Sequence, residues 1–126
     1  MTQLLFRCLA IAVAGSAGAL ARFGVARLFG LLNLQFPLGT MFINLSGSLF
    51  LGWFLTYTGP RNVSDTFRLA IGVGFVGAYT TFSTYMYESF SLLNKGAVLE
   101  AMVNLIGSLI LGMLAVALGV WLAKAA

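Results

Sequence analysis

The chain is built from long uncharged apolar stretches that short charged or turn-forming segments separate. Its charges leave four uncharged intervals, at residues 8–21, 28–60, 69–87 and 101–123. Because a helix needs about 20 mostly apolar residues to cross a bilayer, the pattern predicts four membrane-spanning helices. We expect their bounds at roughly 5–27, 37–58, 67–93 and 98–122, which leaves a single membrane domain, residues 1–126, with short connections.

Turn and capping signals fall between these stretches. Pro37 is acceptable at a helix start, and residues 59–62 (GPRN) end the second stretch. Ser64 or Asp65 can cap the third helix, and residues 94–96 form a tight connection to the fourth.

The first stretch has a second interpretation. Arg7, the apolar run after it and the Ala-Leu-Ala sequence at 19–21 imitate a secretory signal peptide with its cleavage site. We favour a spanning helix, because the segment that follows does not resemble a mature soluble domain.

Composition excludes most soluble functions. The chain is 60% hydrophobic and 8% charged, with a mean hydropathy of +1.00, whereas soluble domains carry about 25% charged residues. It contains no His, one Cys (Cys8) and three carboxylates, Asp65, Glu88 and Glu100. Metal clusters of His or Cys, an internal disulfide and paired acid–base catalysis are therefore not expected. A small integral membrane protein without enzymatic activity is the class that remains.

The basic residues divide almost evenly between the two membrane faces. With four spans, the termini and the central loop share one face. Four basic residues lie on that face and three on the other: Arg7, Arg61, Arg68 and Lys124, against Arg22, Arg27 and Lys95. So weak a bias predicts insertion in both orientations and an antiparallel homodimer with an inverted copy.

Small residues predict close packing and one interrupted helix. Three pairs spaced four apart are typical of closely packed helices: Ala14 with Gly18, Ser48 with Gly52, and Ser108 with Gly112. Residues 72–77 read GVGFVG, and hydroxyl residues follow them. Because glycines and Ser or Thr weaken a helix, we predict a break in the third span near 77–81. A kinked but intact helix is the alternative.

Uncharged polar side chains lie at membrane depth and must face protein or water. They are Asn44 in the second span, Thr80, Thr81, Ser83 and Thr84 in the third, and Asn104 and Ser108 on one face of the fourth. Phe82 and Tyr85, three residues apart, can offer positive ring edges. No carboxylate lies in the first two spans, and Glu88 stands near the end of the third. The pattern favours a path for a small anion over proton-coupled export.

Three motifs in this order resemble those of the Fluc-type (CrcB-like) fluoride channels. They are GSAGALAR at residues 15–22, GTMFINLSG at 39–47 and GFVGAYTTFST at 74–84. The likeness covers essentially the whole chain, and the third motif is the most specific. It implies a dual-topology antiparallel homodimer with two fluoride pores, which exports toxic cytoplasmic fluoride passively across the bacterial inner membrane.

The resemblance also implies roles for particular residues. A structural sodium ion at the dimer centre would be held by the backbone carbonyls of Gly77 and Thr80. The fluoride pore would contain Asn44, Phe82, Ser83, Tyr85, Asn104 and Ser108, with Arg22 at a vestibule and Glu88 near a pore mouth. Two positions differ from the common family pattern, because Tyr85 replaces Phe and Ala78 replaces Gly.

Two other classes of membrane protein are alternatives to this channel. A small dual-topology multidrug exporter also has four short spans, but it needs a carboxylate in the first span, which this chain lacks. A holin-like structural protein would require neither Asn44 nor the hydroxyl track of residues 80–84.

Overall fold

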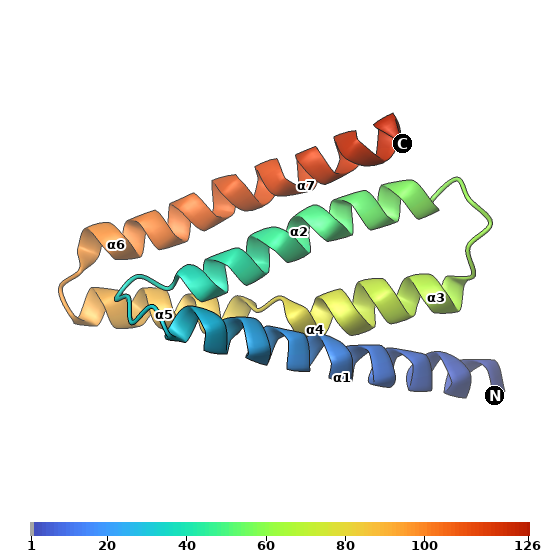
Figure 1. Ribbon diagram of the computed structural model, residues 1–126, viewed down its shortest axis with the longest axis horizontal. Helices are drawn as coiled ribbons and strands as arrows, with labels where there is room; N and C mark the ends of the chain where they lie inside the picture. The colour runs from blue at the N-terminus through green and yellow to red at the C-terminus, as the bar shows by residue number, and fades with distance from the viewer. Residues whose placement is uncertain (1) are drawn as a thin grey trace.

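The computed structural model describes residues 2–126, and this part of the chain forms four antiparallel helical segments without a strand (Figure 1). The first two segments are α1 (Thr2–Gly30) and α2 (Leu38–Thr58). The third comprises α3 (Asp65–Leu69), η1 (Ala70–Val76), α4 (Gly77–Tyr79) and α5 (Phe82–Asn94). The fourth is continuous and comprises α6 (Val98–Met102), η2 (Val103–Gly107) and α7 (Ser108–Ala125). The prediction of an all-helical fold with four segments is confirmed.

Three of these segments are long and apolar enough to cross a membrane: Thr2–Gly30, Leu38–Thr58 and Val98–Ala125. The third segment is excluded from this set because it is divided into shorter helices. Figure 1 places both termini and the α2–α3 connection at one end of the bundle, and the other two connections at the opposite end. At the end with the termini, Arg7 and Asp65 form an ion pair of 3.7 Å between α1 and α3.

The helix ends follow the turn and capping signals. α2 begins after Pro37 and ends at Thr58, with Gly59 as its C-cap. Ser64 is the N-cap of α3, where its hydroxyl accepts a hydrogen bond of 3.3 Å from the amide of Phe67. Gly96 has a φ of 77°, a left-handed conformation that allows the tight turn after α5. The capping role of Ser64 is therefore confirmed.

Backbones approach closely at glycines in two places. A Cβ on Gly18 of α1 would collide with the carbonyl of Phe75, and one on Gly119 of α7 would collide with the carbonyl of Leu49. Gly52 also packs on α7, where a Cβ would lie 2.6 Å from the carbonyl oxygen of Val116. Within the single chain Gly112 makes no close approach, because a Cβ there would meet nothing within 4 Å.

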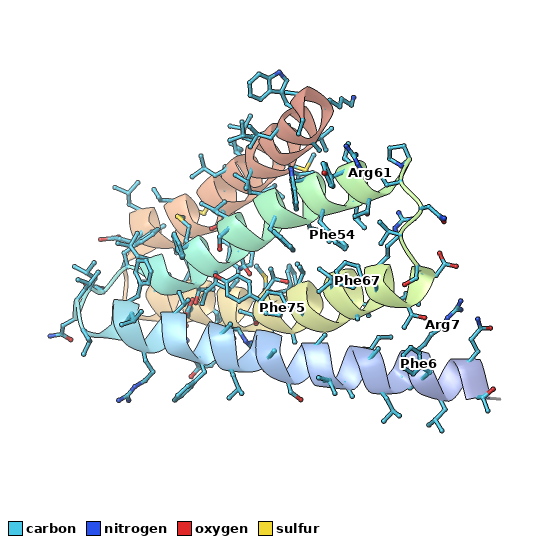
Figure 2. All side chains as sticks on the ribbon, turned by 45° about the vertical axis from the view of Figure 1, so that its right-hand side comes forward. Phe6, Arg7, Phe54, Arg61, Phe67 and Phe75 are labelled. Carbon is cyan, nitrogen blue, oxygen red and sulfur yellow. The ribbon has the colours of Figure 1, made fainter. Side chains whose placement is uncertain are left out.

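The interior of the chain is small and partly polar. Ile43, Val76 and Asn104 are among its most buried residues. Phe54 of α2 and Phe67 of α3 face each other, with ring centroids 6.0 Å apart (Figure 2). Large apolar side chains cover the outside of the helices, as lipid-facing surfaces require. Two π-helical turns, η1 and η2, were not predicted from the sequence.

Candidate functional site

The third segment is interrupted in its middle. The helix ends at Tyr79, and Thr80 and Thr81 are extended, with φ and ψ of −79° and 159°, and of −150° and 120°. The break therefore lies at residues 80–81, inside the predicted range of 77–81. Thr81 caps the next helix, because its hydroxyl accepts a hydrogen bond of 3.3 Å from the amide of Thr84.

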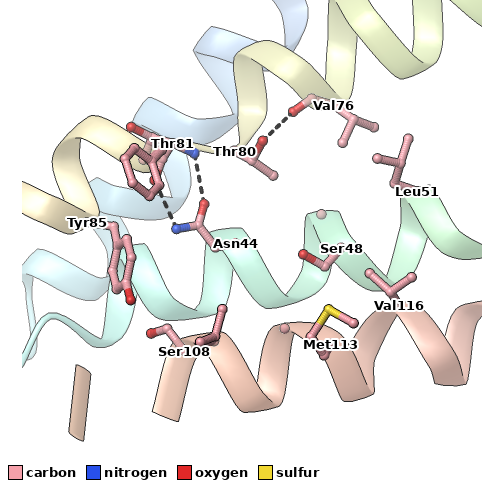
Figure 3. A pocket seen from close by; sticks show the side chains of 14 residues that line it. Asn44, Ser48, Leu51, Val76, Thr80, Thr81, Tyr85, Ser108, Met113 and Val116 are labelled. Atoms are coloured by element: carbon pink, nitrogen blue, oxygen red, sulfur yellow. Dashed lines mark hydrogen bonds between the residues drawn. The ribbon is translucent and has the colours of Figure 1, made fainter. Parts of the chain in front are cut away.

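Asn44 of α2 fixes this break from the neighbouring helix. Its Oδ1 accepts a hydrogen bond of 2.8 Å from the amide of Thr81, and its Nδ2 donates one of 3.0 Å to the carbonyl of Thr81 (Figure 3). The oxygen of the side chain thus replaces the helical acceptor that the amide of Thr81 lacks at the break, and its nitrogen adds a second bond to the same residue. A carboxamide nitrogen carries two hydrogens, so the second remains for another acceptor.

The same arrangement leaves two backbone carbonyls without their helical donors. In a continuous helix the amide of Thr81 would bind the carbonyl of Gly77, but here it binds Asn44. The amide of Thr84 would bind the carbonyl of Thr80, but it binds the hydroxyl of Thr81. The carbonyls of Gly77 and Thr80 are therefore left without these helical donors, and their oxygens can coordinate a cation.

A groove of about 390 Å³ runs beside the break, between α2, α5 and α7 (Figure 3). All of its lining residues are uncharged. They are Asn44, Gly47, Ser48, Leu51, Val76, Thr80, Thr81, Phe82, Tyr85, Ser108, Leu109, Gly112, Met113 and Val116. The groove therefore offers amide and hydroxyl groups on an otherwise apolar wall, hereafter the uncharged groove.

Two aromatic rings flank the polar part of the uncharged groove. Phe82 and Tyr85 lie with ring centroids 6.0 Å apart and planes inclined at 61°, an edge-to-face arrangement. The side of Phe82 away from this contact is open, since Phe82 is 73% exposed. The Tyr85 hydroxyl points elsewhere and donates a hydrogen bond of 2.6 Å to the carbonyl of Leu105.

The structure brings together four of the six residues predicted for the pore. Asn44, Phe82, Tyr85 and Ser108 line the uncharged groove. Ser83 is exposed on α5 and is not among the lining residues. Asn104 is 0% exposed and is not among the lining residues, so its role in the pore stays a prediction. It belongs to η2, and its Nδ2 donates a hydrogen bond to Ser89 of α5.

Glu88 lies in a second cavity of about 240 Å³, near the α1–α2 connection. Its Oε1 accepts a hydrogen bond of 2.9 Å from the hydroxyl of Thr40, which also lines this cavity. Its Oε2 is buried and has no hydrogen-bond partner among the described residues. Arg22 is half-buried on α1 and lines neither of these two cavities.

Sequence reasoning missed Thr40 and Ser48 as companions of Asn44. The three residues are spaced four apart, so they form a polar stripe on one face of α2. That spacing was the signal that could have found them. Metal-binding side chains are not gathered here, since no group of three His, Cys, Asp or Glu occurs among residues 2–126.

Comparison with known proteins finds relatives over most of the chain. The family model described as "CrcB-like protein, Camphor Resistance (CrcB)" matches residues 9–120. A "Fluoride-specific ion channel FluC" of Methylococcus capsulatus is 45% identical over 117 residues, which are 91% of this chain and 51% of that protein. Proteins with the same name from a Synechococcus species and from Methylobacterium radiotolerans are each 41% identical. The matched residues cover 91% and 89% of this chain, and 90% and 80% of those relatives. The chain thus spans about half the length of the Methylococcus relative and most of the other two.

Proposed function

The chain belongs to the CrcB-like family, and from this membership we propose that it is a fluoride-selective ion channel in a bacterial membrane. The relatives named above are ion channels by name rather than enzymes. The observation that carries the proposal is the uncharged groove, in which Asn44, Ser108 and the rings of Phe82 and Tyr85 meet at the broken third segment.

The chemistry of this groove suits a small, strongly hydrated anion. The remaining Nδ2 hydrogen of Asn44 and the hydroxyls of Ser48 and Ser108 are neutral donors that can replace part of the hydration shell. The positive edge of an aromatic ring adds a weak attraction. Because no lining residue carries a fixed positive charge, the anion is stabilised without being held too tightly to leave.

Passive conduction fits the groove better than coupled transport. Proton coupling in membrane proteins commonly uses an ionisable residue on the substrate path. The groove has none among its lining residues, and Glu88, the carboxylate nearest in sequence to the break, lies in a separate cavity with Thr40. We therefore propose that Glu88 lies at the pore mouth. The proposal that Arg22 lies at the vestibule rests on the family resemblance alone. The absence of an acidic residue from α1 also weighs against a multidrug exporter.

The proposed assembly is an antiparallel homodimer with an inverted copy. The uncharged groove and the exposed face of Phe82 lie on the outside of the single chain, so a second chain is needed to enclose a path. Basic residues at both ends of the bundle leave little preference for one orientation. Two inverted copies that meet at the break would enclose two equivalent pores.

A structural sodium ion at the dimer centre is part of the same proposal. Sodium is a hard cation that unwound backbone carbonyls coordinate in membrane proteins. The free carbonyls of Gly77 and Thr80 fit this donor set, since the amides of Thr81 and Thr84 are bound elsewhere. When bound, the ion would supply positive charge that offsets the crowded carbonyl dipoles.

The test is efflux from liposomes that contain the purified protein and are loaded with potassium fluoride or potassium chloride. Fluoride should leave rapidly once a potassium ionophore balances the charge, while chloride stays inside. Protein-free liposomes give the background leak. Equal efflux of both anions would reject selectivity, and retention of both would reject channel activity.

A further inference from the structure

We propose that Asn104 is a positioning residue for the anion path, acting from behind the groove on Ser108 and Tyr85. The inference rests on the proposed function, because it assigns a role in conduction to a residue that does not face the groove. Asn104 is completely buried, and both ends of its carboxamide are bonded. A buried amide left without partners would be strongly disfavoured, so these bonds fix its orientation.

The first connection runs from Asn104 to the groove. The hydroxyl of Ser108, a lining residue, donates to Oδ1 of Asn104 at 3.4 Å. This distance is at the outer limit of hydrogen bonding, so the bond is weak. The hydroxyl can therefore turn its proton to a passing anion and return it to Asn104 afterwards. Without this acceptor, the hydroxyl of a helical serine bonds to a carbonyl of its own helix.

The second connection runs from Asn104 to Tyr85. Nδ2 of Asn104 donates to the hydroxyl of Ser89 at 2.8 Å, and that hydroxyl donates to the carbonyl of Tyr85, also at 2.8 Å. The Tyr85 hydroxyl in turn donates to the carbonyl of Leu105, the neighbour of Asn104. These bonds close a ring between α5 and η2 that holds the aromatic wall of the groove.

Asn104 reaches both elements because it lies between them. Residues four apart lie on one face of a helix, and the 3.4 Å contact between Ser108 and Asn104 keeps the two side chains together across η2, Val103–Gly107. Asn104 also donates to Ser89 of α5, while Ser108 lines the groove. Asn104 is therefore the amide that joins α5 to a groove hydroxyl.

The experiment is a double-mutant cycle in the fluoride efflux assay with the full-length protein. Asn104→Leu, similar in size and unable to hydrogen-bond, should slow fluoride efflux by about fivefold or more, and Ser108→Ala should also slow it. The double variant should be faster than the product of the two single effects predicts, because Asn104 and Ser108 share one connection, and slower than Ser108→Ala alone, because Asn104 also acts on Tyr85. Loss of fold alone would not produce such non-additivity in variants that elute as the native assembly.

Thr58→Ala is the matched control. Thr58 is a buried hydroxyl at the opposite end of α2 that donates to the carbonyl of Phe54 at 2.7 Å, away from the groove. It should leave efflux unchanged. If Asn104→Leu does not assemble, Ser89→Ala removes the same support from the α5 side and should slow efflux several-fold.

Wild-type rates of fluoride efflux in Asn104→Leu, or in Ser89→Ala if Asn104→Leu does not assemble, would overturn the inference. So would a double variant whose loss of efflux equals the product of the losses in Asn104→Leu and Ser108→Ala. Failure of the proposed function is distinguishable from either result, because it would be seen in the parent protein as efflux without fluoride selectivity.

Discussion

Asn44 combines a structural and a functional task in one amide. Its oxygen and one of its amide hydrogens hold the peptide unit of Thr81 at the break. The other hydrogen remains for the groove, which Asn44 lines together with Ser108. Tyr85 divides its tasks in a similar way, because its ring faces the groove while its hydroxyl is bonded to Leu105.

Replacing Asn44 with Ala should slow fluoride efflux at least tenfold, because the groove loses a donor and the break loses its support. The free energy of unfolding should fall by about 1–3 kcal/mol, since the buried amide of Thr81 is left without a partner. Efflux and thermal melting measure the two effects. Ser46→Ala is the control on the same helix, because Ser46 bonds to Tyr79 and does not line the groove. Equal efflux from both variants would remove Asn44 from the anion path.

Tyr85→Phe and Tyr85→Leu separate the ring from the hydroxyl. The Phe variant should keep fluoride selectivity and efflux within about twofold and lose about 1 kcal/mol of stability, because only the bond to Leu105 disappears. The Leu variant should lose most efflux, since the ring edge is gone. Loss of selectivity in the Phe variant would show that the hydroxyl binds the anion directly.

At the scale of the elements, the interrupted third segment defines the molecule. Its break follows from glycines and hydroxyl residues that favour neither a continuous helix nor lipid exposure, and this could be predicted from residues 72–84. The π-helical turns could not, because they carry no compositional signature. Asn104, within η2, is buried and donates to Ser89 of α5. The sequence pointed to Asn44 as a pore residue, but nothing in it showed that Asn44 holds the backbone of Thr81 at the break.

Thr81→Ala tests the link between the cap of α5 and the proposed sodium site. Without the Thr81 hydroxyl, the amide of Thr84 can bond to the carbonyl of Thr80 and compete with sodium. The sodium concentration needed for half-maximal efflux should rise several-fold, with N-methylglucamine as the replacing cation.

Ser64→Ala is the matched control for this change. Ser64 caps α3 with a bond of the same length, 3.3 Å, at the far end of the segment. Both variants should lose about 1 kcal/mol of stability, as N-caps do. The sodium dependence should move in Thr81→Ala alone, and an unchanged dependence there would exclude Thr80 as a ligand.

At the scale of the whole molecule, the single chain is incomplete as a channel. Its groove lies open at the surface, and lipid-facing apolar side chains surround the bundle. The two ends carry four and three basic residues, so the fold itself sets no strong orientation. We therefore expect two inverted copies to cover each other's grooves.

Orientation can be measured with a small epitope tag on the C-terminus. The tag is probed in inside-out and in right-side-out vesicles, each intact and permeabilised. Comparable amounts of the tag should be accessible in the two kinds of intact vesicle, because the tag lies on both faces of the membrane. Adding three lysines after Ala126 should shift the population toward one face and reduce efflux, because the inverted partner becomes scarce. A tag found on one face only in the parent protein would contradict the antiparallel dimer.

The central claim is that fluoride passes along the uncharged groove, and Gly112 allows the most direct test. Gly112 lines the groove and has open space at its Cβ, whereas Gly24 on α1 has the same space but does not line the groove. In a Cys8→Ser background, each glycine is changed to Cys and modified with a methanethiosulfonate reagent after reconstitution, and fluoride efflux is recorded before and after. The account predicts that modification at position 112 blocks efflux while modification at position 24 leaves it unchanged. Undiminished efflux after complete modification at position 112 would contradict it.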